Sequence, residues 1–126
     1  MTKPHIAFFL PSLRGGGAER TMLNIAIGLS ESGYKVDLIL AQAVGEFLGQ
    51  VPEHIRLVNL KSNSAIASTP GLVRYLRREK PCVIFPVLPH ISLVALVGRV
   101  LAGSRTRVIP VQQNTLSQSI HHANSW

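Results

Sequence analysis

The chain has 126 residues, of which 46% are hydrophobic and 15% charged, a composition typical of a folded domain and not of a disordered chain. Thirteen Lys and Arg against six Asp and Glu give a formal net charge of +7, which indicates anionic partners such as phosphorylated ligands, nucleic acid or an anionic membrane surface. Aromatic residues make up only 6% and are not interleaved with basic ones, so no nucleic acid is expected among the partners.

The single cysteine, Cys82, excludes an internal disulfide framework and favours the reducing cytoplasm. Because it starts an apolar run, we expect a buried, inert thiol. The first apolar run is short and no small-residue cleavage site follows it, so it is not a signal peptide. The apolar stretch 83–101 is about long enough to span a bilayer, but two prolines and a histidine predict that it breaks into strand, loop and helix.

The first predicted element is a buried strand over 5–10, followed by a loop with three adjacent glycines and a helix over 19–32. A strand, a glycine turn and a helix can present backbone N–H groups and a helix N-terminus to a phosphate or another anion. Three glycines lose much backbone entropy on folding, which indicates that a ligand approaches the backbone closely. A tight turn without a ligand is the alternative.

Two common phosphate-binding motifs do not fit this loop. A P-loop closes with Gly-Lys-Ser or Gly-Lys-Thr, whereas Gly17 is followed by Ala18 and Glu19. A dinucleotide fingerprint needs a third glycine for close packing of helix and strand, and this chain has Arg20 at that place.

The helix over 19–32 should end in a left-handed cap at Gly33. Strands are predicted over 36–40 and 55–60, with an irregular segment over 45–54 between them. The apolar residues expected to face inward from the helix are Met22, Leu23, Ile25, Ala26 and Leu29.

A second helix is predicted from Thr69 as N-cap and Pro70 at the first helical position, and Pro81 ends it. Its basic side indicates either a solvated face with cations near the helix C-terminus or docking on anionic lipid. The apolar side carries Leu72, Val73, Tyr75 and Leu76, and the basic residues are Arg74, Arg77, Arg78 and Lys80.

A strand over 83–88, a largely buried helix over 92–102 capped by Gly103, and a strand over 107–111 complete the predicted elements. This order predicts an α/β fold of the Rossmann-like, three-layer α/β/α kind with a mostly parallel sheet. Ligands bind such sheets beyond the carboxyl ends of the strands. We therefore expect the glycine loop, the 87–90 turn and the 112–117 loop to meet at one site.

The run Gly15-Gly16-Gly17-Ala18-Glu19-Arg20 after an N-terminal strand resembles the GGAER-type loop of family 4 (group 1) glycosyltransferases of the GT-B fold. Two weaker similarities are the strand from Pro81 with its helix to Gly103, and the segment 111–117. The resemblance covers essentially all of residues 1–126 and implies the N-terminal, acceptor-side half of a GT-B fold. The C-terminal donor-binding domain with its E-x7-E motif is absent from this chain, so the fragment alone should be inactive.

The resemblance implies transfer of a sugar, with retention, from a nucleotide-sugar donor to an envelope glycan or lipid-linked acceptor. The protein would then be cytoplasmic and peripheral at the inner face of the cytoplasmic membrane. The alternative is a stand-alone Rossmann-like module that binds a nucleotide or phosphorylated metabolite. In the glycosyltransferase reaction, the glycine loop would stabilise the negative charge that develops on the leaving phosphate of the donor.

The candidate substrate-binding residues include His90, which is chosen for its place on the turn after the fourth strand. Gln112 and Gln113 replace the family's Glu and its Arg or His, so neither can be a general base and the catalytic residues stay unassigned. Adjacent His121 and His122 do not form an i, i+4 pair, and we expect no metal site and no cofactor besides the donor substrate. The candidates are Gly15, Gly16, Gly17, Glu19, Arg20, His90, Gln113 and Asn114.

Overall fold

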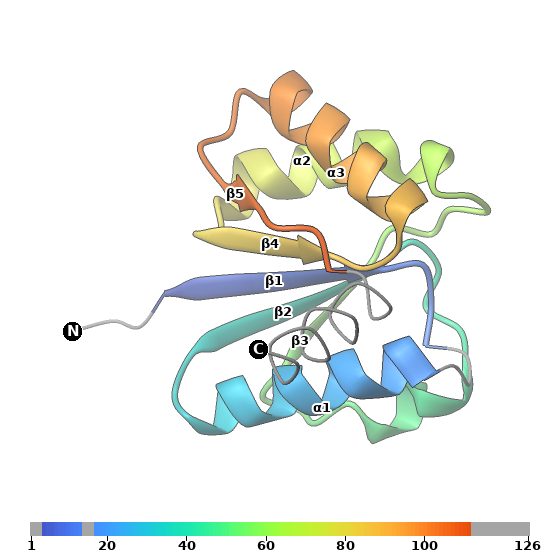
Figure 1. Cartoon of the computed structure of the whole chain (residues 1–126), viewed down its shortest axis with the longest axis vertical. Helices are drawn as coiled ribbons and strands as arrows, with labels where there is room; N and C mark the ends of the chain where they lie inside the picture. Colours follow the sequence, from blue (N-terminus) through green and yellow to red (C-terminus); the bar gives the residue numbers. More distant parts are fainter. Residues whose placement is uncertain (1–3, 14–16, 112–126) are drawn as a thin grey trace, which may run out of the picture.

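The computed structural model describes residues 4–13 and 17–111, which form a sheet flanked by helices (Figure 1). The strands are β1 (His5–Leu10), β2 (Lys35–Leu40), β3 (Arg56–Asn59), β4 (Val83–Pro86) and β5 (Arg107–Val108). The α-helices are α1 (Gly17–Glu31), α2 (Thr69–Glu79) and α3 (Pro89–Ala102). Two short 3-10 helices, η1 (Glu46–Gln50) and η2 (Ile66–Ser68), lie in the connections.

The strands form one sheet in the order β3-β2-β1-β4-β5, and each of its four pairings is parallel. Helix α1 covers one face of the sheet, and α2 and α3 cover the other (Figure 1). The predicted Rossmann-like three-layer α/β/α arrangement is thereby confirmed for the described residues.

Strand β1 lies in the middle of the sheet and supplies side chains to both hydrophobic cores. Ile6, Phe8 and Leu10 belong to the cluster that includes residues of α1, whereas Ala7 and Phe9 belong to the cluster with α2 and α3. Successive side chains of a strand point to opposite faces, so a strand covered on both faces must be apolar throughout. This requirement explains the continuous apolar run that predicted β1.

Several predicted boundaries need correction: α1 begins at Gly17 and not at residue 19, α3 begins at Pro89 and not at residue 92, and β5 ends at Val108 and not at residue 111. Helix α2 begins at Thr69 itself, its N-cap is Ser68, and no side chain caps it. The side chain of Ile25, which was expected to face inward, is 42% exposed, because the buried side of α1 is centred on Met22, Leu23 and Ala26. The left-handed caps are confirmed, with φ of 99° at Gly33 and 62° at Gly103.

Helix α3 is not largely buried, contrary to the expectation from its composition. Its inner side packs closely on α2, where a Cβ atom on Gly98 would lie 3.0 Å from a methyl group of Leu72. Its outer side is exposed, because the sheet and α2 cover only one side of the helix. The exposed aliphatic residues of α3 are Leu93, Leu96, Val97, Val100 and Leu101.

The apolar stretch 83–101 is broken as predicted, into β4 and most of α3. Within residues 4–13 and 17–111, no helix has both the length and the apolar character needed to cross a membrane.

A buried carboxylate joins the sheet to α2. Asp37 on β2 is fully buried, and one of its oxygens, Oδ2, accepts hydrogen bonds from the Tyr75 hydroxyl and from His5 Nε2, each at 2.6 Å. The other oxygen, Oδ1, has no partner among the described residues. Burial and the hydrogen bond to Asp37 raise the pKa of Tyr75, so the phenol stays neutral and donates.

We predict strong coupling between Tyr75 and Asp37 in a double-mutant cycle of Tyr75→Phe and Asp37→Asn. A hydrogen bond to a buried charged group contributes about 1.5–3 kcal/mol to stability, and Tyr75→Phe alone should cost about that much. In the Asp37→Asn background the same change should cost much less. Urea unfolding of the four proteins measures the coupling, and additive costs would contradict the role given to this hydrogen bond.

Candidate functional site

The candidate site lies at the edge of the sheet where β1 and β4 end. The chain leaves β1 toward β2 on one side, and β4 pairs with β1 on the other, so the strand order reverses between β1 and β4. In open parallel sheets this reversal opens a crevice outside the carboxyl ends of the strands, where ligands bind. The connections β1–α1 and β4–α3 both emerge at this edge, on the right of Figure 1.

Helix α1 begins at this edge with Gly17, one of the three glycines of the loop. Glu19 is half-buried in the first turn, where a carboxylate complements the positive end of the helix dipole. Gly15 and Gly16 lie outside the described residues, so the structure assigns the site only the helical end of the glycine loop.

Arg20 is exposed on the same first turns of α1 and contacts a neighbouring aromatic ring. Its guanidinium carbon lies 5.6 Å from the ring centroid of Phe47, a cation–π distance. The backbone N–H of Phe47 donates to the carbonyl of Leu13, which holds η1 against the connection after β1. Arg20 therefore has a packing role at this edge beside any contact with a ligand.

His90 lies across the edge of the sheet, as the second residue of α3, and its side chain is exposed. It follows Leu88, whose φ of 84° and ψ of 147° fall in a region that essentially only glycine adopts without strain. Both the backbone N–H and the hydroxyl of Ser92 donate to the Leu88 carbonyl at 3.0 Å. This strain could not be predicted, since a residue before proline is expected to be extended with negative φ.

The end of the described chain returns to the same edge. Val111 pairs with Val87 in a parallel bridge, and its N–H donates to the Pro86 carbonyl at 2.8 Å. Gln113 and Asn114 lie outside the described residues, as does Gln112. Of the predicted site residues, the structure therefore brings Gly17, Glu19, Arg20 and His90 to one edge of the sheet, on α1 and α3.

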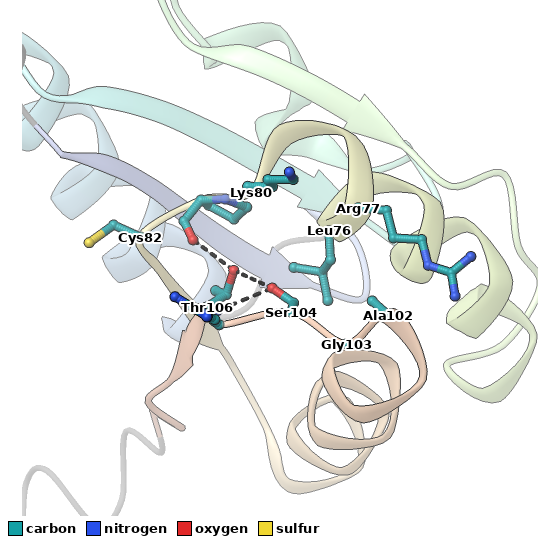
Figure 2. A pocket seen from close by; sticks show the side chains of 10 residues that line it. Leu76, Arg77, Lys80, Cys82, Ala102, Gly103, Ser104 and Thr106 are labelled. Atoms are coloured by element: carbon teal, nitrogen blue, oxygen red, sulfur yellow. Dashed lines mark hydrogen bonds between the residues drawn. The ribbon is translucent and has the colours of Figure 1, made fainter.

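A hollow of about 570 Å³ lies at the opposite edge, between the C-terminal ends of α2 and α3 (Figure 2). Its hydroxyls are engaged: Thr106 donates to the Pro81 carbonyl at 2.7 Å, and Ser104 donates to the Thr106 hydroxyl at 2.8 Å. Two helix C-termini disfavour an anion there, although Arg77 and Lys80 line the hollow. This hollow is therefore not a candidate for the phosphate site.

Cys82 lines that hollow and is exposed, which corrects the expectation of a buried thiol. It comes before the first residue of β4, at the amino end of the strand, where the sheet leaves its side chain uncovered. The apolar run that suggested burial begins one residue later.

A scan of protein-family models gives no match, and a search of curated protein sequences gives none either. Among solved structures, the chain is similar to the apo form of the lipopolysaccharide outer core galactosyltransferase WaaB. The TM-score is 0.67 at 16% sequence identity, and the likeness covers 86% of this chain and 33% of the galactosyltransferase. The chain thus spans about a third of that protein's length. The likeness identifies the fold as a Rossmann-like α/β domain of the kind found in GT-B glycosyltransferases.

We predict that glycine and alanine exchange their usual order of stability at position 88. Both Leu88→Gly and Leu88→Ala lose the half-buried leucine side chain, but only glycine relieves the strained backbone. The glycine variant should be more stable than the alanine variant by about 1–2 kcal/mol. Urea unfolding measures the difference, and the same pair at Leu57 in β3 is the control, where alanine should be the more stable. An alanine advantage at position 88 would argue against the strain.

Proposed function

We propose that this chain is the acceptor-side domain of a retaining glycosyltransferase of family 4 (group 1). The observation that carries the proposal is the place of Gly17, Glu19 and Arg20, the last part of the GGGAER run: they open α1 at the edge where the strand order reverses, in a fold shared with a glycosyltransferase. At this place backbone N–H groups at the start of α1 can face a phosphate.

In the proposed reaction, the nucleotide sugar is the donor and an envelope glycan or lipid-linked sugar is the acceptor. The bond from the anomeric carbon to the donor's diphosphate breaks, and negative charge develops on the leaving phosphate. Backbone N–H groups at the start of α1 would stabilise that charge. His90, at the start of α3, is available to bind a sugar hydroxyl from the other side of the crevice.

Most of the donor-binding surface, with the E-x7-E motif, would belong to a C-terminal domain of the full-length enzyme. We place the protein in the cytoplasm, at the inner face of the cytoplasmic membrane, where a lipid-linked acceptor would be reached. Transfer should need no metal ion or other cofactor, and activity in the presence of EDTA tests this part of the proposal.

A side chain at Gly16 should block sugar transfer in a protein that joins this chain to a donor domain. Gly16→Val should abolish sugar transfer while leaving the fold intact, because a side chain in the glycine loop prevents close approach of the diphosphate. Transfer from radiolabelled nucleotide sugars measures activity, and circular dichroism checks the fold. Gly28→Ala, at an open position on α1, is a matched control that should keep full activity. Unchanged turnover of Gly16→Val would remove the loop from the site.

A calorimetric titration of the 126-residue chain with UDP, GDP and their sugar conjugates separates the two functions that the sequence leaves open. Weak or absent binding by the folded chain is expected for an acceptor-side half. Tight, saturable binding would mean that the nucleotide site is complete in these residues and would favour a stand-alone nucleotide-binding module.

A further inference from the structure

The charges of this protein are segregated along the chain. Nine of the thirteen Lys and Arg residues, but only one of the six acidic residues, lie between residues 54 and 126. That acidic residue, Glu79, already accepts a hydrogen bond from Arg56 at 2.5 Å, and this bond lowers the pKa of Glu79. The layer formed by α2 and α3 therefore carries positive charge. Residues 54–126 contain no free carboxylate side chain that would balance it.

Three arginines of α2 lie on its outer surface, away from the sheet. Arg74, Arg77 and Arg78 are exposed and line a shallow hollow of about 420 Å³, together with Pro70 and Val73. Arg77 also donates to the Leu101 carbonyl of α3 at 3.1 Å, which places the arginine row directly beside α3. Within the described residues, Arg74 and Arg78 have no hydrogen bond and no ion pair. Guanidinium groups in this state are free to bind phosphate.

Helix α3 presents an apolar stripe next to this arginine row. Leu93 is 64% exposed and Val100 is 74% exposed, although outward positions of a surface helix are normally polar. Val97 and Leu101 are exposed on the same side, so the stripe runs along the helix at spacings of three and four residues. Both helices lie on the same face of the sheet, opposite α1 (Figure 1).

We propose that the outer surface of α2 and α3 docks on a bilayer that contains anionic phospholipid. The arginine row would bind lipid phosphates, and the stripe of α3 would enter the boundary between headgroups and acyl chains. An apolar face beside clustered cations is the pattern of surface-lying membrane helices, and a polybasic segment is attracted to an anionic leaflet. The positive charge favours an anionic surface over a second copy of this chain, which would repel the first.

The docking face leads directly to the candidate site. His90 precedes Leu93 by three residues and Val97 by seven, so it lies in line with the apolar stripe at the start of α3. Docking along this stripe would bring the crevice at the carboxyl ends of β1 and β4 close to the headgroups. The inference rests on the proposed function in one respect only, which is that a lipid-linked acceptor would be the reason for the protein to bind a lipid surface.

Co-sedimentation of the 126-residue chain with vesicles tests the docking face without any sugar nucleotide or acceptor. Binding to vesicles of phosphatidylglycerol and phosphatidylcholine should exceed binding to phosphatidylcholine alone, and it should weaken as salt rises. Arg74→Gln with Arg78→Gln should reduce binding roughly 30-fold. The matched control, Lys35→Gln with Arg107→Gln, removes the same charge at the amino ends of β2 and β5 and should reduce binding much less.

The apolar stripe is tested by Leu93→Gln with Val100→Gln, which keeps helix propensity and should reduce binding about tenfold. Ile25→Gln on α1, on the opposite face of the sheet, should leave binding unchanged. An environment-sensitive dye on Val100→Cys in a Cys82→Ser background should brighten with anionic vesicles, whereas the same dye on Ile25→Cys should not.

Three results would overturn the proposal. One is equal binding of the protein to anionic and to neutral vesicles. Another is an equal loss of vesicle binding in the arginine double variant and in its control double variant. The third is a dimer that Leu93→Gln with Val100→Gln dissociates, because protein would then cover the stripe. None of these results depends on glycosyl transfer, so failure of the docking face and failure of the proposed function are distinguishable.

Discussion

The fold depends on one constraint, which is the burial of β1 on both faces and along both of its edges. β1 pairs with β2 and β4, and its alternate residues enter the two cores. The buried part of this strand, residues 6–10, is therefore apolar throughout, and only His5 at its start is partly exposed. Its carboxyl end is also where the strand order reverses, so the element that organises the core sets the place of the crevice.

The arrangement of strands and helices could be predicted because each signal was local. Five apolar residues in a row marked β1, and the left-handed glycines at 33 and 103 marked two helix ends. The burial of individual side chains was less predictable, because it depends on which neighbour covers a helix. The apolar sequence of α3 says nothing of how far α2 and the sheet extend over it, and so its outer stripe was expected to be buried.

In the candidate site, too, features with a local signal could be predicted, whereas contacts with distant segments could not. The place of Gly17, Glu19 and His90 at one edge of the sheet followed from the rule for parallel sheets. The contact between Arg20 and Phe47 could not be predicted, since η1 lies in a segment without clear periodicity. The buried group of His5, Asp37 and Tyr75 had one available signal, an aspartate inside an apolar strand, but its partners are 32 and 38 residues away in sequence.

The two faces of the sheet differ in a way that bears on function. The α1 side supplies Gly17, the last glycine of the loop, and the α2–α3 side carries the unbalanced arginines and the exposed aliphatic stripe. The edge where the strand order reverses lies between these two sides, because α1 starts after β1 and α3 starts after β4. Under the proposed function, a donor phosphate at the start of α1 and a lipid-linked acceptor arriving along α3 would therefore approach this edge from opposite faces of the sheet. In this geometry a soluble donor and a membrane-bound acceptor need not compete for one entrance.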